Sequence, residues 1–149
     1  MPLHYKRITL TVADLERSLR IYRDVLGFTV HYIQDSEPDS FSYPVFKIPK
    51  EAKIRFATLD SPDQVRTLGI TEVTGVALPK PALPHMSASV IQVDDLVGTM
   101  EKIAELGLEV TDTKTDTNDK YTFIEQAFVD FDGHLVVLYE LQAALEGLK

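Results

Sequence analysis

The sequence contains no cysteine among its 149 residues. The chain can therefore form no disulfide, and it offers no thiolate to a nucleophilic mechanism, a zinc ribbon or an iron–sulfur cluster. Basic residues are also few: 15 lysines and arginines stand against 23 aspartates and glutamates, which gives a formal net charge of −8. Because the basic residues form no cluster, this balance argues against nucleic acid or an anionic membrane as the main partner.

Long apolar runs are missing too. No run approaches the roughly 20 residues that span a bilayer, and the first residues, MPLHYKR, lack the apolar core of a secretion signal. The local motifs of P-loop proteins, dinucleotide-binding domains, zinc proteases and serine hydrolases are also absent. The remaining composition, 44% hydrophobic and 26% charged, is that of an ordinary globular protein. We expect a soluble cytoplasmic protein with no membrane partner.

The chain contains an internal repeat. Residues 8–27 (ITLTVADLERSLRIYRDVLG) and 89–107 (SVIQVDDLVGTMEKIAELG) both read as a strand, an Asp-Leu pair, an amphipathic helix and a Leu-Gly pair. The V-x-D-L pattern recurs 81 residues along the chain, and the Leu-Gly pair recurs after 80 residues. This similarity indicates two copies of one supersecondary unit.

Each copy carries the residues that its elements need. Residues 8–12 alternate between apolar and polar side chains, as in a half-buried strand. Asp14 can cap the following helix, because its carboxylate can accept hydrogen bonds from the free amides of the first turn. In the second copy, Asp94 or Asp95 has the same position. A glycine then follows each helix and permits the positive φ that ends it.

Three strand-like runs follow each helix, at 28–34, 41–48 and 52–59 in the first copy and at 108–114, 120–129 and 134–141 in the second. The chain is therefore expected to have an α+β fold of two βαβββ modules in tandem. We place the first module at 1–60, a linker at 61–84, the second module at 85–142 and a tail at 143–149. Within the linker, 70–78 could form an extra strand or a dimer contact. Two such sheets can close edge to edge into a curved, cup-shaped mixed sheet whose concave face is free for a ligand.

Three stretches, at residues 8–28, 93–110 and 128–140, resemble the vicinal oxygen chelate superfamily. This superfamily holds glyoxalase I, the extradiol dioxygenases and the bleomycin-resistance proteins. The resemblance implies the glyoxalase/bleomycin-resistance fold, a homodimer and a small-molecule ligand in the cup. It also implies a divalent metal held at four cup-facing positions, one near the start and one near the end of each module.

Transferred to this sequence, the four metal positions fall on Arg7, Arg55, Ala88 and Val137. None of these side chains is a ligand for a hard cation or for a zinc-type ion. We therefore predict no cofactor. A divalent metal remains possible if the alignment of these positions is displaced, and the fallback ligands are then His4, His85 and Glu140.

The two arginines suggest a different chemistry at the metal position. Arg7 and Arg55 share the predicted cup-facing side of the first module, where fixed guanidinium groups could replace the ion and bind a carboxylate or phosphate. Alternatively, Arg7 extends into solvent and Arg55 pairs with an acid such as Glu125. The predicted ligand-binding residues are Arg7, Thr9, Arg55, Ala88, Val90, Gln92, Val137 and Tyr139.

Three functions are compatible with these residues. The first is a metal-free superfamily member that binds a small anionic or aromatic molecule in the cup, as the bleomycin-resistance proteins do. The second is a metal-dependent lyase or dioxygenase of the glyoxalase I or extradiol type with a displaced metal site. The third is a metal-free isomerase or lyase in which Arg7 and Arg55 act electrostatically. The sequence identifies neither the substrate nor the catalytic residues.

Overall fold

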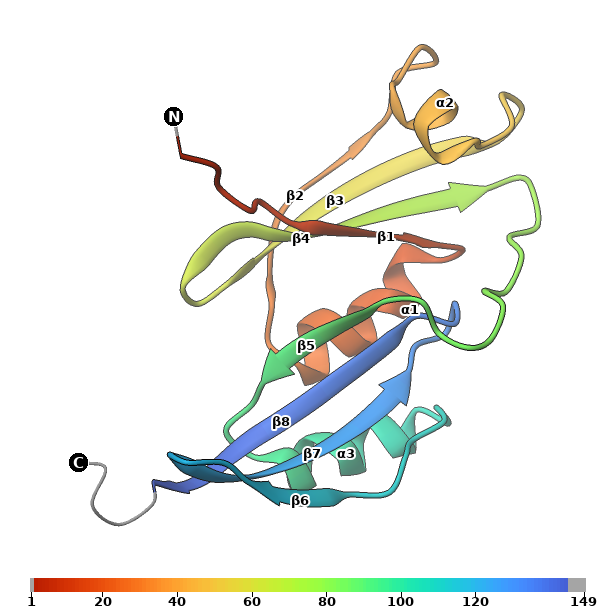
Figure 1. Ribbon diagram of the computed structural model, residues 1–149. Helices are drawn as coiled ribbons and strands as arrows, with labels where there is room; N and C mark the ends of the chain where they lie inside the picture. The colour runs from red at the N-terminus through yellow and green to blue at the C-terminus, as the bar shows by residue number, and fades with distance from the viewer. Residues whose placement is uncertain (1, 145–149) are drawn as a thin grey trace. The chain divides into compact units, whose positions relative to one another are not determined.

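The computed structural model describes residues 2–144 of the chain. They fall into two compact units, Met1–Lys80 and Pro81–Lys149. Each unit holds one four-stranded sheet, so each is considered by itself (Figure 1).

The first unit has the strand order β1-β4-β3-β2. Strand β1 runs parallel to β4, and the other two pairs are antiparallel. Helix α1 passes directly into a turn of π-helix, η1, before the chain returns to the sheet. In chain order the elements are β1 (Ile8–Val12), α1 (Leu15–Leu19), η1 (Arg20–Val25), β2 (Thr29–Asp35), α2 (Ser42–Phe46), β3 (Lys53–Ser61) and β4 (Gln64–Thr74).

The second unit repeats this topology with the order β5-β8-β7-β6. Strand β5 is again parallel to the last strand of its unit. The elements are β5 (Ala88–Gln92), α3 (Leu96–Glu105), β6 (Lys114–Thr117), β7 (Tyr121–Val129) and β8 (Leu135–Ala144). The predicted α+β fold of two βαβββ modules is therefore confirmed.

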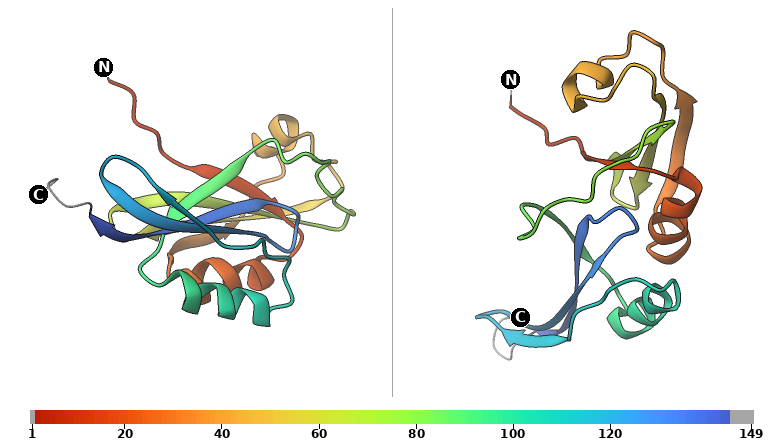
Figure 2. Two further views of the ribbon diagram at one scale, coloured as in Figure 1. Left: turned by 60° about the horizontal axis from the view of Figure 1, so that its bottom comes forward. Right: turned by 90° about the vertical axis from the view of Figure 1, so that its right-hand side faces the viewer.

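Two sequence predictions in the first unit are wrong. Residues 41–48 do not form a strand but contain the short helix α2, which lies beyond the end of the first sheet (Figures 1 and 2). Tyr43 of α2 is buried with Ile54 and Val73, and its hydroxyl donates to the carbonyl of Ala52. The predicted linker at 61–84 contains β4, so the first module extends past residue 60 and includes this strand.

The alternative of an extra strand at 70–78 is correct as far as Thr74, where β4 ends. At the other end of the chain, β8 continues through the start of the predicted tail, and residues 145–149 lie outside the described part.

The core of the first unit lies on one face of its sheet, between the strands and α1. Apolar side chains of β1, β3 and β4 meet those of α1 and η1 there. The residues of this helix-side core that are at most 5% exposed are Leu10, Val12, Leu15, Leu19, Ile21, Tyr22, Ala57, Leu59, Leu68 and Ile70. The opposite face, which we call the distal face, carries Thr9, Thr11, Phe56, Thr58, Gly69 and Thr71.

Helices α1 and α3 begin with the same pair of contacts to acidic side chains. Asp14 accepts a hydrogen bond from the Arg17 amide at 3.1 Å, and Asp95 accepts one from the Gly98 amide at 3.0 Å. A glutamate from the last strand of each unit adds a second contact, because Glu72 accepts from the Leu15 amide and Glu140 from the Leu96 amide. The helix starts predicted from V-x-D-L are confirmed, and Asp95 rather than Asp94 is the second cap.

This capping leads to a stability prediction. Replacing Asp95 with alanine leaves a first-turn amide of α3 without its acceptor, so we expect a loss of about 1 kcal/mol in the free energy of unfolding, measured by urea titration. The neighbouring Asp94→Ala variant is the matched control and should lose far less. Equal losses in the two variants would contradict the assignment of Asp95 as the cap.

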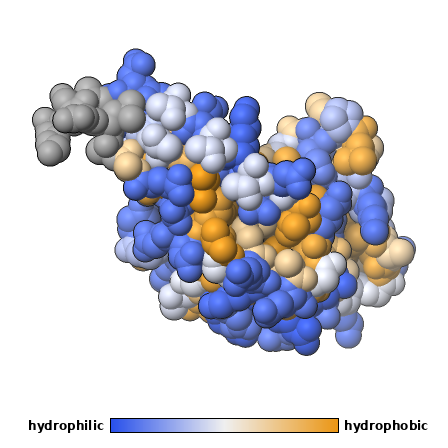
Figure 3. Space-filling view, turned by 90° about the horizontal axis from the view of Figure 1, so that it is seen from below, coloured by the Kyte–Doolittle hydropathy of each residue, from blue (hydrophilic) through white to orange (hydrophobic). Residues whose placement is uncertain are grey.

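No helix within the described residues is long and apolar enough to cross a membrane. The face of the molecule that Figure 3 presents is mostly hydrophilic, and its hydrophobic side chains gather in narrow strips.

Candidate functional site

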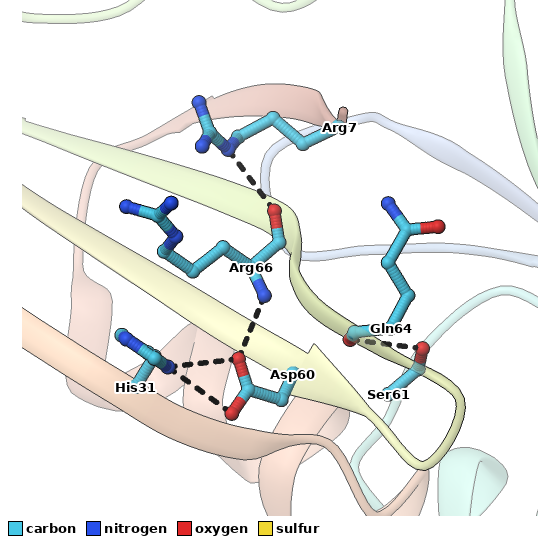
Figure 4. A network of polar contacts seen from close by, with 6 residues as sticks. All are labelled: Arg7, His31, Asp60, Ser61, Gln64 and Arg66. Carbon is cyan, nitrogen blue, oxygen red and sulfur yellow. Dashed lines mark hydrogen bonds and ion pairs between the residues drawn. The ribbon is translucent and has the colours of Figure 1, made fainter. Parts of the chain in front are cut away.

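Four polar residues from four adjacent segments of the first sheet come together near the β3–β4 hairpin (Figure 4). Arg7 immediately precedes β1, Arg66 lies in β4, Asp60 in β3 and His31 in β2. Arg7 alternates with Ile8, and its Cδ would lie 3.2 Å from a Cβ added at Gly69, so its side chain leaves the sheet on the distal face. We call Arg7, His31, Asp60 and Arg66 the distal cluster.

Three backbone irregularities shape the distal cluster. The register of β3 against β4 shifts between Leu59 and Ser61, at Asp60 itself. The register of β2 against β3 shifts between Val30 and Tyr32, which makes His31 the extra residue of a β-bulge. Such bulges redirect a side chain out of the regular alternation. Arg66 has a φ of 53°, in the left-handed region that non-glycine residues seldom adopt. The sheet therefore departs from regular geometry at Asp60 and at two residues that both contact it.

The hairpin is tied to the segment before β1. Ser61 Oγ donates to the carbonyl of Gln64 at 3.3 Å, and Gln64 Nε2 donates to the carbonyl of Lys6 at 2.8 Å. Arg7 Nε donates to the carbonyl of Arg66 at 3.1 Å. These contacts hold Arg7 beside β4 although the residue lies outside the β1–β4 ladder.

Asp60 is the electrostatic centre of the cluster. Its Oδ1 accepts the Arg66 amide at 2.7 Å, and His31 Nδ1 lies 3.1 Å from Oδ1 and 3.2 Å from Oδ2. The Arg66 amide lowers the pKa of Asp60 most strongly; desolvation opposes this effect and the contact with His31 adds to it. Asp60 is thus held as a carboxylate.

The cluster also presents two guanidinium groups. Beyond the Nε contact of Arg7, neither guanidinium has a hydrogen-bond partner within residues 2–144. Figure 4 shows them extending in the same direction, with the His31 ring on that side of Asp60. A pair of planar guanidinium groups suits the oxygens of a carboxylate or a phosphate.

A glycine makes room for Arg7 on the distal face. A Cβ added at Gly69 would lie 2.8 Å from Thr9 Oγ1 and 3.2 Å from both Arg7 Cδ and Phe56 Cε2. Thr58 and Thr71 are fully buried on the same face, and neither hydroxyl has a partner within the described chain. The centre of the distal face is therefore closely packed around unpaired hydroxyl groups.

The structure contradicts the predicted pairing of Arg7 with Arg55. Arg55 lies opposite Glu72, and Glu72 lies opposite Val12, which places Arg55 on the helix side of the sheet. Its Nε and Nη2 each donate to Glu72 at 3.2 Å, and this carboxylate raises the pKa of Arg55. The alternative of an acidic partner for Arg55 is correct in kind, but the partner is Glu72 and not Glu125.

Five predicted ligand-binding residues share one face of the second sheet, namely Ala88, Val90, Gln92, Val137 and Tyr139. Val90 lies opposite Val137 and is 64% exposed. Gln92 lies opposite Tyr139 and accepts a hydrogen bond from its hydroxyl at 3.2 Å. Of the remaining predicted residues, Thr9 lies with Arg7 on the distal face of the first sheet.

The residues at the implied metal positions do not fit a metal ion. In the second unit Val90 lies opposite Val137, and in the first unit Thr9 lies opposite Gly69. Gly69 is thus the counterpart of Val137, and it replaces Arg55 as the fourth position. The four positions are Arg7, Gly69, Ala88 and Val137, which offer no oxygen, imidazole or thiolate ligand from their side chains.

Of the fallback ligands, Glu140 accepts a hydrogen bond from the Leu96 amide at the start of α3. Within the described residues, no group of three or more histidine, aspartate or glutamate side chains is arranged to hold a metal ion.

Comparison with known proteins supports the fold. A family model, the Glyoxalase/Bleomycin resistance protein/Dioxygenase superfamily, matches residues 4–138. No curated protein sequence matches the chain.

Among solved structures, a glyoxalase family protein from Bacillus cereus has a TM-score of 0.76 at 12% identity, over 96% of this chain and 97% of the other. The fosfomycin resistance protein FosX from Listeria monocytogenes, solved with Mn(II) and 1S,2S-dihydroxypropylphosphonic acid, has a TM-score of 0.62 at 17% identity, over 94% and 93%. The trypanothione-dependent glyoxalase I of Leishmania major has a TM-score of 0.61 at 17% identity, over 93% of this chain and 87% of the other. At sequence identities this low, the structural similarity shows a shared fold and nothing about function. With the family match over most of its length, the chain belongs to the glyoxalase/bleomycin resistance protein/dioxygenase superfamily.

Proposed function

We propose that the distal face of the first unit binds a small anionic molecule and that the guanidinium groups of Arg7 and Arg66 hold it without a metal ion. The observation that carries the proposal is the pair of guanidinium groups that extend together from adjacent strands (Figure 4). Arg7 Nε also contacts the Arg66 carbonyl at 3.1 Å, so the two side chains start from neighbouring points and one small anion can contact both guanidinium groups. Arg66 has the role that the sequence assigned to Arg55.

The chemistry of the side chains favours a carboxylate, a phosphate or a phosphonate. An anion brought next to two guanidinium groups forms charge-assisted hydrogen bonds, which are about twice as strong as neutral ones. The FosX structure from Listeria monocytogenes carries a phosphonic acid together with Mn(II). In the present chain the proposed cationic groups are side chains, so binding would not depend on an added metal.

The test is a titration of ¹⁵N-labelled protein with inorganic phosphate and with oxalate after treatment with a chelator. We expect saturable chemical-shift changes at the amides around residues 60–69. Arg7→Gln and Arg66→Gln should each weaken binding about tenfold, since each removes charge-assisted hydrogen bonds to the anion. Arg20→Gln, at an exposed position of η1, is the matched control and should bind as the wild type does.

Two results would contradict the proposal. One is unchanged affinity in both distal-cluster variants. The other is binding that occurs only after Mn(II) is added, which would indicate a metal site formed by other residues.

The homodimer and the cytoplasmic location expected from the sequence stay predictions. Light scattering of the purified protein would test the homodimer by measuring its molar mass in solution.

A further inference from the structure

His31 and Asp60 form a pair whose geometry is that of an acid–base dyad. Asp60 lies against Nδ1 of the imidazole at 3.1 Å, so the carboxylate favours a proton on Nδ1 and leaves the lone pair on Nε2. The His31 side chain is 40% exposed. Nε2 is therefore the ring nitrogen that a bound molecule can reach.

The surroundings fix Asp60 before any ligand arrives. Its Oδ1 accepts the Arg66 amide at 2.7 Å, and Arg66 has a left-handed backbone at this contact. The bulge at His31 brings the imidazole to the same carboxylate from the other side. A left-handed conformation in a non-glycine residue persists where the surrounding structure imposes it, and it often accompanies function.

The arrangement of the strands places the dyad beside the anion site. The sheet order β1-β4-β3-β2 brings Arg7, Arg66, Asp60 and His31 into one row across the sheet. The two guanidinium groups occupy one end of the row and the imidazole the other, with Asp60 between Arg66 and His31. A molecule that extends along this row from the guanidinium groups toward the imidazole would thus meet both a base and a cationic donor for any negative charge that develops.

We propose that His31, positioned by Asp60, removes and returns a proton on a small oxo acid held by Arg7 and Arg66; this inference rests on the proposed anion site. The carboxylate of the oxo acid takes one guanidinium, and its ketone oxygen takes the other. This class has both an anionic group for the arginines and an acidic C–H for the base.

The step needs no oxidant, metal or second substrate. Nε2 of neutral His31 accepts the proton from the carbon beside the ketone. The C–H electron pair becomes a C=C bond, and the carbonyl π pair moves onto the ketone oxygen, which a guanidinium N–H stabilises as an enolate. The imidazolium, stabilised by Asp60 through Nδ1–H, then returns the proton to carbon. In D₂O the exposed imidazolium exchanges this proton with solvent before the return, so deuterium is delivered to carbon and the reaction appears as exchange.

The first test concerns the tautomer of His31. Long-range ¹H–¹⁵N spectra, recorded well above the ordinary pKa of histidine, distinguish Nδ1–H from Nε2–H, and His85 serves as a reference in the same spectrum. We expect the Nδ1–H form in the wild type. Asp60→Asn should change it to Nε2–H, because its amide oxygen can still accept the Arg66 amide while its NH₂ group donates to Nδ1. This change would show that Asp60 sets the protonated nitrogen of His31, and an Nε2–H tautomer in the wild type overturns the proposal.

The second test is deuterium exchange into pyruvate and acetoacetate, followed by proton NMR. We expect the chelator-treated wild-type protein to accelerate exchange at least about 100-fold over buffer for one of the two acids, the lower range of general acid–base catalysis. His31→Gln should abolish the acceleration while its phosphate affinity stays within about threefold of the wild type. Arg20→Gln is the control and should exchange as the wild type does.

The outcomes separate this inference from the proposed function. Normal phosphate binding with no exchange of either acid overturns the dyad and leaves the anion site standing. Loss of exchange in His31→Gln with retained phosphate binding supports both. Phosphate affinity that is the same in Arg7→Gln, Arg66→Gln and the wild type overturns the anion site and, with it, this inference.

Discussion

Replacing Phe128 with alanine is expected to cost about 3–5 kcal/mol in the free energy of unfolding of the second unit. Phe128 lies in β7 with 0% exposure, opposite Val136 of β8. It belongs to the core that α3 covers with Met100 and Ile103. Truncation removes the largest buried side chain of this unit and leaves a cavity that the strands cannot close. Because whole domains are stable by only about 5–15 kcal/mol, urea unfolding followed by circular dichroism should show a clearly lowered midpoint.

The same strand supplies the matched control. Phe123 also lies in β7, but it is paired with Leu141 on the other face and is only half-buried. Phe123→Ala should cost about 1 kcal/mol or less, since much of the ring is already in contact with water. An equal cost in the two variants would contradict a core confined to the helix side of the second sheet.

The repeated parts of the fold could be predicted from the sequence because local signals agree there. In V-x-D-L the strand alternation ends where an aspartate cap and an apolar helix stripe begin, and the structure starts α1 and α3 at those leucines. The caps are Asp14 and Asp95. Where propensity, periodicity and capping indicate the same boundary, the element is well determined.

The strands of the first unit are harder to predict from the sequence, because two segments give conflicting local signals. The apolar alternation at 41–48 resembles a strand, but Pro44 cannot donate to a ladder, and Tyr43 is buried with Ile54 and Val73 at the end of the sheet. Strand β4 contains Gly69 and the left-handed Arg66, which both weaken a strand pattern. Its pairing with β1 is a long-range contact that no local pattern reveals.

The candidate site was predicted only at Arg7. Arg55 is predicted on the distal face because Ile54 and Phe56 resemble residues of the helix side, whereas the helix-side core of β3 is Ala57 and Leu59. Ile54 is buried on the other face, where it packs with Tyr43. A shift of one residue in this assignment moves every side chain of a strand to the other face.

His31, Asp60 and Arg66 were missed for a related reason. A bulge and a left-handed residue bring them together, and neither follows the period of two on which the sequence prediction rests. The only local signal is the turn-forming sequence Asp60-Ser61-Pro62-Asp63, which marks a hairpin end without specifying what gathers there.

Replacing Gly69 with valine should disable the anion site and destabilise the first unit together. A Cβ at this position would lie 2.8 Å from Thr9 Oγ1 and 3.2 Å from Arg7 Cδ, and valine adds two methyl groups beyond it. Overpacking of this kind costs about 1–3 kcal/mol. The Thr9 hydroxyl is the nearest atom and must move, and the flexible Arg7 side chain must also give way to the added methyl groups. Phosphate and oxalate binding should therefore weaken at least about tenfold, as in Arg7→Gln.

Thr71→Val tests whether the effect comes from position 69 and not from any change on the distal face. Thr71 lies two residues further along β4, is 1% exposed, and has a hydroxyl without a partner among the described residues. Valine has the same shape and removes a buried unpaired polar group, so stability should be equal or higher and phosphate binding unchanged. Gly69→Ala, which adds only the Cβ, should fall between the wild type and Gly69→Val in both measurements. If Gly69→Val folds and binds phosphate as the wild type does, then Arg7 does not need the space above Gly69, and its place in the anion site is contradicted.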